Sequence, residues 1–164
     1  MDAYSLWKTA HIISAAILFG TGLGIAFFAW FGYRRAIRTG ELDGLRTVLH
    51  LTVLADLFFT TPAVVFQLLS GAVLMNMDSW SPYSPWALTV LGLFILVGLL
   101  WLPVVVVQIA MSREAEKAGS FQALSPKFHQ RFIAWFVLGI PAFLLVLVIF
   151  FLMVAKPLSV MAAG

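Results

Sequence analysis

Four long apolar runs dominate this sequence, over residues 4–33, 47–75, 86–111 and 128–155. A helix crosses a hydrocarbon core about 30 Å thick with about 20 apolar residues, so each run is long enough to span a bilayer. Lipid offers no water to bond the backbone, and a spanning run must therefore coil into a helix. The sequence predicts an all-α polytopic membrane protein, a four-helix transmembrane bundle that forms a single domain over residues 1–164.

The composition excludes a water-soluble fold and several classes of chemistry. Of the residues, 62% are hydrophobic and 10% are charged, whereas soluble domains carry about 25% charged residues. The absence of cysteine excludes disulfides, thiolate metal sites and cysteine nucleophiles. The sequence has no glycine-rich phosphate loop and no paired carboxylates, which argues against hydrolases. A net charge of only +3 gives no reason to expect a nucleic-acid partner, so the lipid bilayer is the predicted partner.

The positions of the basic residues predict the orientation of the chain. Cytoplasmic loops of membrane proteins are enriched in Lys and Arg, and the connection at 76–86 has neither. Lys8 and Lys156 are the two basic residues expected on the outer side. Both termini and the 76–86 connection are therefore predicted to lie outside (N-out/C-out). The other eight basic residues lie in or beside the first and third connections: Arg34, Arg35, Arg38, Arg46, Arg113, Lys117, Lys127 and Arg131.

Proline and glycine residues are expected to shape the helices. Pro62, Pro103 and Pro141 fall near the middle of three runs, where each removes one backbone hydrogen bond and favours a kink. Because the freed carbonyls need polar partners in lipid, we expect the kinks to face the bundle interior. Gly20 and Gly24 are spaced so that another backbone can approach closely, either within the bundle or in a homodimer.

Asp56 is the one acidic residue of the sequence that falls inside a spanning run. A charged Asp at this depth is costly, so it is expected to be protonated, paired with a cation or close to water. An ion pair with Arg131, supported by Gln108, is one structural interpretation, and a place on a proton path is the catalytic one. Small and polar residues share its predicted helix face at spacings of three or four: Asp56, Thr60, Ala63, Gln67 and Gly71.

The three histidines are the candidate ligands of a cofactor. Haem b in a helical membrane bundle needs one or two axial ligands, usually imidazole, at matching depth. His50 and His129 both lie at predicted cytoplasmic ends of helices and match in depth. His11 lies in the opposite half of the bilayer. For each histidine, a hydrogen-bonded side chain without a ligand is the open alternative. The methionines near the depth of His11 are those at positions 75, 77 and 153.

Several segments resemble a known family over nearly the whole chain. They are residues 6–15 (LWKTAHIISA), 19–22 (FGTG), 55–63 (ADLFFTTPA) and 101–105 (WLPVV). Together they resemble domain-of-unknown-function family 2269, a set of small bacterial integral membrane proteins. The first-helix pattern is also similar to HemJ-type protoporphyrinogen oxidases and CopD membrane proteins. These resemblances imply a bacterial inner membrane location and suggest His11 as a haem ligand, while giving no second ligand.

Three functions from different classes follow as hypotheses. The first is a haem-b-binding protein that transfers electrons or oxidises a hydrophobic substrate, hence a membrane oxidoreductase, with Asp56 near its proton path. The second is a small transporter or metal-handling protein, in which Asp56, Gln67 and His11 line a path with Met75 or Met77. The third is a structural or assembly subunit of a membrane complex, in which the polar residues only join helices.

Overall fold

The computed structural model describes residues 2–78 and 81–155, and all of the regular structure within them is helical. The helices are α1 (Ala3–Thr39), α2 (Asp43–Ala55), the π-helix η1 (Asp56–Thr60), α3 (Thr61–Met77), α4 (Pro85–Lys117), the 3₁₀-helix η2 (Phe121–Ala123) and α5 (Pro126–Ala155). Since α2, η1 and α3 are continuous, they form one long rod. Four helical rods are long and apolar enough to cross a membrane, at Ala3–Thr39, Asp43–Met77, Pro85–Lys117 and Pro126–Ala155. The predicted four-helix membrane fold is confirmed.

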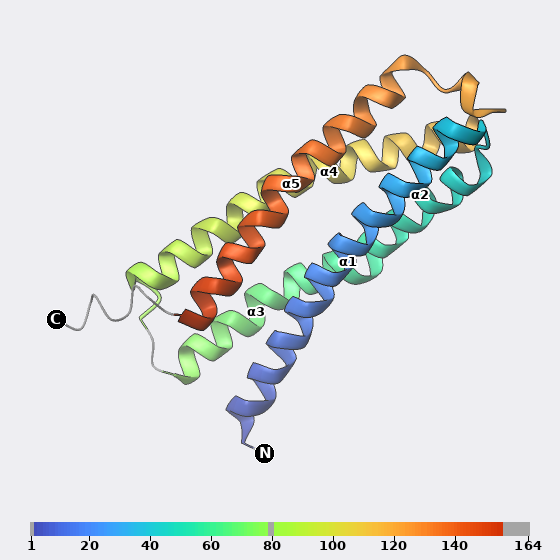
Figure 1. Cartoon of the computed structure of the whole chain (residues 1–164). Helices are drawn as coiled ribbons and strands as arrows, with labels where there is room; N and C mark the ends of the chain where they lie inside the picture. The colour runs from blue at the N-terminus through green and yellow to red at the C-terminus, as the bar shows by residue number, and fades with distance from the viewer. Residues whose placement is uncertain (1, 79–80, 156–164) are drawn as a thin grey trace.

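The four rods run antiparallel in sequence order, so that both described ends of the chain lie at one end of the bundle (Figure 1). The turns after α1 and after α4 lie at the opposite end, which we call the basic end because it carries the eight basic residues of the first and third connections. The other end is called the terminal end. Trp80 and Lys156, assigned above to the outer side, lie outside the described residues.

A glycine makes the turn from α1 to α2. Gly40 has a φ of 73°, in the left-handed region, and its N–H donates to Ala36 O at 2.9 Å. A left-handed residue after the last turn satisfies a free carbonyl of the helix, and glycine adopts it without steric strain. The chain therefore reverses within three residues, and α2 returns alongside α1.

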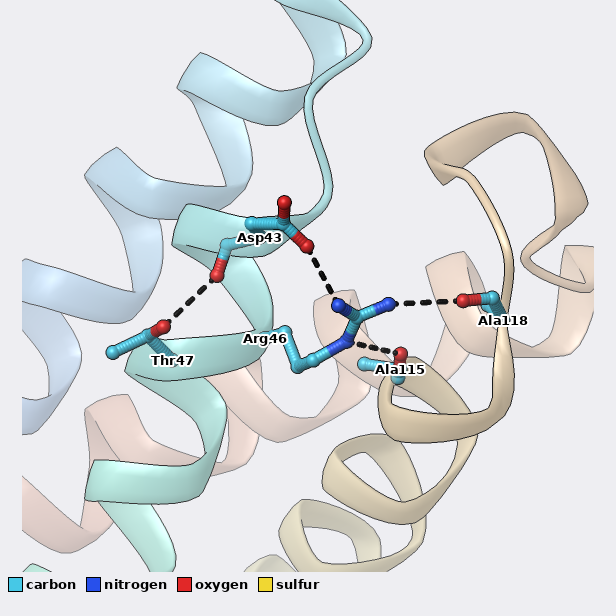
Figure 2. Close-up of polar contacts among 5 residues, drawn as sticks. All are labelled: Asp43, Arg46, Thr47, Ala115 and Ala118. Atoms are coloured by element: carbon cyan, nitrogen blue, oxygen red, sulfur yellow. Dashed lines mark hydrogen bonds and ion pairs between the residues drawn. The ribbon is translucent and has the colours of Figure 1, made fainter.

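Arg46 joins α2 to the end of α4 (Figure 2). Its Nε donates to Ala115 O at 3.1 Å and its Nη2 donates to Ala118 O at 3.0 Å. Its Nη1 is 2.6 Å from Asp43 Oδ1, which holds the guanidinium in place. The last carbonyls of a helix lack intrahelical partners and carry partial negative charge. In the sequence, Arg46 served only to predict the orientation of the chain. In the structure, it caps the C-terminus of α4.

The apolar core is concentrated at the basic end. Tyr33, Leu45, Met111, Phe128 and Phe132 are among its buried members, which come from α1, α2, α4 and α5. Toward the terminal end, α1 and α3 diverge from α4 and α5 (Figure 1). Long side chains bridge the two pairs there. Phe19 of α1 stacks on Phe143 of α5 with ring centroids 4.7 Å apart, and Met75 of α3 packs against the cluster around Trp86.

The three prolines that were expected to kink the helices toward the bundle interior lie on its outer surface instead. Pro62, Pro103 and Pro141 are all exposed on the lipid-facing surface. A proline ring is apolar and donates no hydrogen bond, so lipid solvates it at no polar cost. Of these three helices, only the one with Pro62 changes type near its proline. The π-helix Asp56–Thr60 lies just before Pro62, and the Thr61 N–H donates to Asp56 O, five residues earlier. α4 and α5 stay α-helical through their prolines.

Candidate functional site

Asp56 lies at the centre of a buried polar cluster between α2, α4 and α5. Gln108 of α4 donates from Nε2 to Asp56 Oδ2 at 2.8 Å, and the same nitrogen lies 3.3 Å from Thr52 O. Asp56 is only 7% exposed and Gln108 only 1%. The cluster therefore connects two helical rods through side chains that are shielded from lipid.

Trp135 fixes the orientation of the Gln108 amide. Its indole Nε1–H donates to Gln108 Oε1 at 3.1 Å. An indole nitrogen can only donate, so the atom facing it must be the amide oxygen. The amide NH₂ must then face Asp56. The orientation of Gln108 therefore follows from the donor-only chemistry of the indole nitrogen.

The Asp56 carboxyl has no cationic partner among the described residues. The expected pair with Arg131 does not form, because Arg131 Nη1 lies 3.2 Å from Glu114 Oε2 at the basic end. Thr60 and Trp101 are further neighbours of the carboxyl. The Thr60 hydroxyl is nevertheless buried without a hydrogen-bond partner within the described part of the chain. Asp56 is thus held by uncharged donors rather than by an ion pair.

His11 forms a second polar site, between α1 and α3 in the terminal half. Its Nδ1 lies 2.7 Å from the hydroxyl of Ser70, which is fully buried. Gln67 Nε2 donates to the His11 carbonyl at 2.7 Å. A Cβ atom added at Gly71 would lie 3.6 Å from His11 Cε1, so the imidazole packs edge-on against the α3 backbone. The helix face predicted for Asp56, Thr60, Ala63, Gln67 and Gly71 does turn toward the neighbouring rods.

The buried polar side chains of the described residues continue this face along the bundle. Ser14 of α1 donates to Ala63 O at 3.3 Å and lies between the His11 and Asp56 sites. Sequence reasoning missed Ser70, although it lies fourteen positions after Asp56 and therefore on nearly the same helix face. The buried polar set is Ser14, Thr52, Asp56, Thr60, Ser70, Gln108 and Ser112.

The other two histidines lie at the basic end with separate partners. His50 Nδ1 lies 3.4 Å from Glu116 Oε1, and both side chains are about half exposed. His129 Nδ1 lies 2.8 Å from the Tyr33 hydroxyl, with the ring of Phe121 at a centroid distance of 5.5 Å. No group of three or more His, Asp or Glu side chains able to hold a metal ion occurs within residues 2–78 and 81–155.

Met75 and Met77 are the methionines expected to line a path together with His11. Met75 packs with the apolar cluster formed by Trp86, Ile149 and neighbouring residues. Met77 is 41% exposed near the terminal end. The transport hypothesis therefore depends on the polar residues Asp56 and Gln67, which lie on the same helical rod but in two separate hydrogen-bonded clusters.

Comparisons with known proteins agree with the membrane fold. The family model described as "Predicted integral membrane protein (DUF2269)" matches residues 5–157, nearly the whole chain. No curated protein and no solved structure matches the chain. The matched segment includes both polar clusters and all four membrane-spanning rods except the first two residues of α1. The chain belongs to the DUF2269 family of predicted integral membrane proteins.

Proposed function

We propose that this protein binds haem b through His11 and serves in electron transfer or in the oxidation of a hydrophobic substrate. The observation that carries the proposal is the hydrogen bond between His11 Nδ1 and the buried Ser70 hydroxyl. Histidines that ligate metals almost always use their other ring nitrogen in such a bond, which sets the tautomer and the ring orientation. Haem b would supply one-electron chemistry that side chains of this protein lack.

The direction of the Ser70 bond decides which nitrogen of His11 is free. The single hydroxyl proton of Ser70 is directed to Phe66 O, at 2.5 Å. The hydroxyl must then accept from His11, so Nδ1 carries the hydrogen and Nε2 keeps its lone pair. His11 Nε2 has no partner among the described residues and is not one of their buried unpaired atoms. A lone pair of this kind is what an iron ligand requires.

Two features of the terminal half support the proposal of a haem site at His11. In this half of the bundle, side chains such as Phe19 and Met75, rather than close helix packing, bridge the helix pairs. Long side chains of this kind adapt to a planar apolar guest more readily than tightly packed backbones. Lys8 lies one turn closer to the terminal end on α1 and is exposed. Its ammonium would pair with haem propionates at the membrane surface.

His50 and His129 remain alternative ligands at the basic end. Each also uses Nδ1 in a polar contact, with Glu116 and with Tyr33 respectively. The exposed position of His50 and the aromatic neighbours of His129 favour structural roles for both. Variants of these two residues are therefore the matched controls for His11.

An absorption spectrum of the purified protein tests the proposal. The protein is expressed with added haem precursor, purified in mild detergent and measured oxidised and dithionite-reduced. We expect a Soret band in the wild type, its loss in His11→Ala, and its retention in His50→Ala and His129→Ala. Ser70→Ala is expected to lower haem affinity about 10–100-fold, as loss of an orienting partner does at metal sites. A wild-type protein without a Soret band refutes haem binding, and loss only in His50→Ala or His129→Ala moves the site to the basic end.

Two further experiments separate the remaining hypotheses. A transporter predicts an uptake or resistance phenotype that disappears in Asp56→Asn, and unchanged flux in that variant would argue against it. An assembly subunit predicts co-purification with a larger membrane complex and a nearly silent His11→Ala. Neither a transporter nor an assembly subunit is expected to show haem absorption that disappears in His11→Ala.

A further inference from the structure

The Asp56 cluster is separate from the His11 site and calls for its own explanation. Asp56 is buried 93% on a π-helical turn, a type that is rare and frequently found at functional sites. An ionised carboxyl deep in a membrane is costly unless it is paired, and the described residues supply no cation for it. The negative charge of Asp56 must therefore be compensated by something other than a basic side chain of the described residues.

The groups around the carboxyl argue against a metal ion. Trp135 forces the Gln108 amide to turn its NH₂ toward Asp56 Oδ2, at 2.8 Å. Trp101 is the second nitrogen neighbour of the carboxyl and can only donate. A bound cation needs oxygen ligands, and N–H donors directed at the same place repel it. These donors can instead stabilise the Asp56 carboxyl by itself, either ionised or as a neutral carboxylic acid.

Thr60 supplies the second observation. Its hydroxyl lies on the same rod, one turn after Asp56, and is a neighbour of the carboxyl. It is 6% exposed and has no hydrogen-bond partner among the described residues. The backbone oxygen of Asp56, which a threonine at this spacing would ordinarily reach, is taken by the Thr61 hydroxyl at 2.9 Å. A buried hydroxyl that can both donate and accept therefore lies next to the acid with no other hydrogen-bond partner among the described residues.

We propose that Asp56 and Thr60 form a proton-binding site buried within the membrane. In the protonated state, the carboxyl hydrogen of Asp56 is donated to Thr60 Oγ1, and Oδ2 continues to accept from Gln108. In the deprotonated state, the proton has left to water and the Thr60 hydroxyl rotates to donate to the carboxylate. The same hydroxyl serves both states because it can donate and accept. This site does not depend on haem binding.

Within the described part of the chain, the side chains next to the Asp56 carboxyl are those of Thr60, Gln108 and Trp101, and none of them is charged. Among the titratable groups on the neighbouring helices, His11 contacts Ser70, Tyr33 contacts His129, His50 lies near Glu116, and Glu114 pairs with Arg131.

Infrared spectroscopy of the full-length protein in lipid nanodiscs tests the site. At neutral pH we expect the C=O stretching band of a protonated carboxylic acid, shifted in D₂O and lost in Asp56→Asn. The matched control is Asp43→Asn, since the Asp43 side chain is 92% exposed and pairs with Arg46 at the basic end; this variant should keep the band. If the wild type lacks the band at neutral and mildly acidic pH, or if folded Asp56→Asn retains it, the proposal is overturned.

A second variant keeps the test decisive if Asp56→Asn does not fold. Thr60→Val removes the hydroxyl that donates to the carboxylate, so the acid band is expected to persist to higher pH. It should also shift in frequency, because the acid loses its acceptor. Thr89→Val on the exposed face of α4, where the hydroxyl bonds only Pro85 O, is the control. An unchanged band and pH midpoint in Thr60→Val refute the role of Thr60, and with it the proposed site.

Discussion

Gln108 gains its role from two neighbours on different rods. Asp56 accepts from its nitrogen, and Trp135 donates to its oxygen. The sequence suggested Gln108 as a neighbour of Asp56, and the structure confirms that contact. The contact with Trp135 is visible only in the structure. The amide therefore links α2 to α5 through α4 and limits how far the three helices can rotate relative to one another.

Replacing Gln108 with leucine is expected to destabilise the protein. The change leaves the Trp135 N–H and one Asp56 oxygen buried without partners, and each unsatisfied buried group costs roughly 1–3 kcal/mol. The measurement is the free energy of unfolding in mixed detergent and SDS micelles. Gln130→Leu on the exposed surface of α5 is the control, expected to change stability by less than about 0.5 kcal/mol. Equal stabilities of the two variants would contradict the cluster.

At the scale of elements, the ends of the helices show how the rods are tied together. α1 ends at a left-handed glycine, and α4 ends at carbonyls that Arg46 caps from another rod. Both devices satisfy backbone groups that a helix end leaves free. They lie at the basic end, where the core is also best packed.

The variant Arg46→Lys tests whether Arg46 acts by capping the C-terminus of α4 or only through its positive charge. A lysine keeps the positive charge that orients the chain, but its single ammonium cannot reproduce the planar guanidinium that reaches Ala115 O, Ala118 O and Asp43 together. We expect a loss of about 1.5–3 kcal/mol, the value for hydrogen bonds to charged groups. Arg38→Lys, at an exposed position in the last turn of α1, is the matched variant and should be nearly neutral. A silent Arg46→Lys would mean that only its charge matters.

The turn between α1 and α2 gives a paired glycine test. Gly40→Ala places a Cβ at a positive φ, which costs about 1–2 kcal/mol, and only 2.8 Å from the Gln122 amide. Gly44→Ala in α2 meets no atom within 4 Å and is expected to stabilise the helix by about 0.5–1 kcal/mol. Thermal unfolding of both variants in the same detergent measures the difference. Opposite signs are expected, and a stabilising Gly40→Ala would contradict the observed turn.

At the scale of the whole molecule, the solvent decides the architecture. Apolar side chains cover the rods on all sides, and large ones such as Phe58 at 65% and Val106 at 68% are exposed. Such a surface is stable only against lipid. The basic end and the terminal end then differ chiefly in charge, which predicts how the bundle is oriented.

Single-cysteine labelling tests the orientation, because the natural sequence has no cysteine. Glu41→Cys and Gly119→Cys lie at the basic end and should react with a membrane-impermeant reagent only from the cytoplasmic side. Ser81→Cys, in the connection between α3 and α4, should react only from the outer side. Labelling of all three from one side would contradict the antiparallel rods, and a full exchange of sides would reverse the predicted orientation.

The membrane fold and much of the candidate set could be predicted from local features. Asp56, Gln67, Gln108 and His11 stand out because polar residues are rare in apolar runs. The helix face of Asp56 follows from its spacing, since side chains three or four apart share a face. The partner of Arg131 could not be predicted in this way, because several acidic residues lie at the same depth and helix rotation chooses between them. Its true partner is Glu114.

By itself the sequence determined that four helices span a membrane, because each apolar run is long enough to cross as a helix whose backbone hydrogen bonds close within the segment. It also determined the distribution of basic charge. Only the tertiary structure decided which side chains meet. His11 with Ser70, Asp56 with Gln108, and Arg46 with the end of α4 are contacts across 52 to 72 positions. Such contacts depend on how each rod rotates against its neighbours, and packing of the whole bundle sets that rotation.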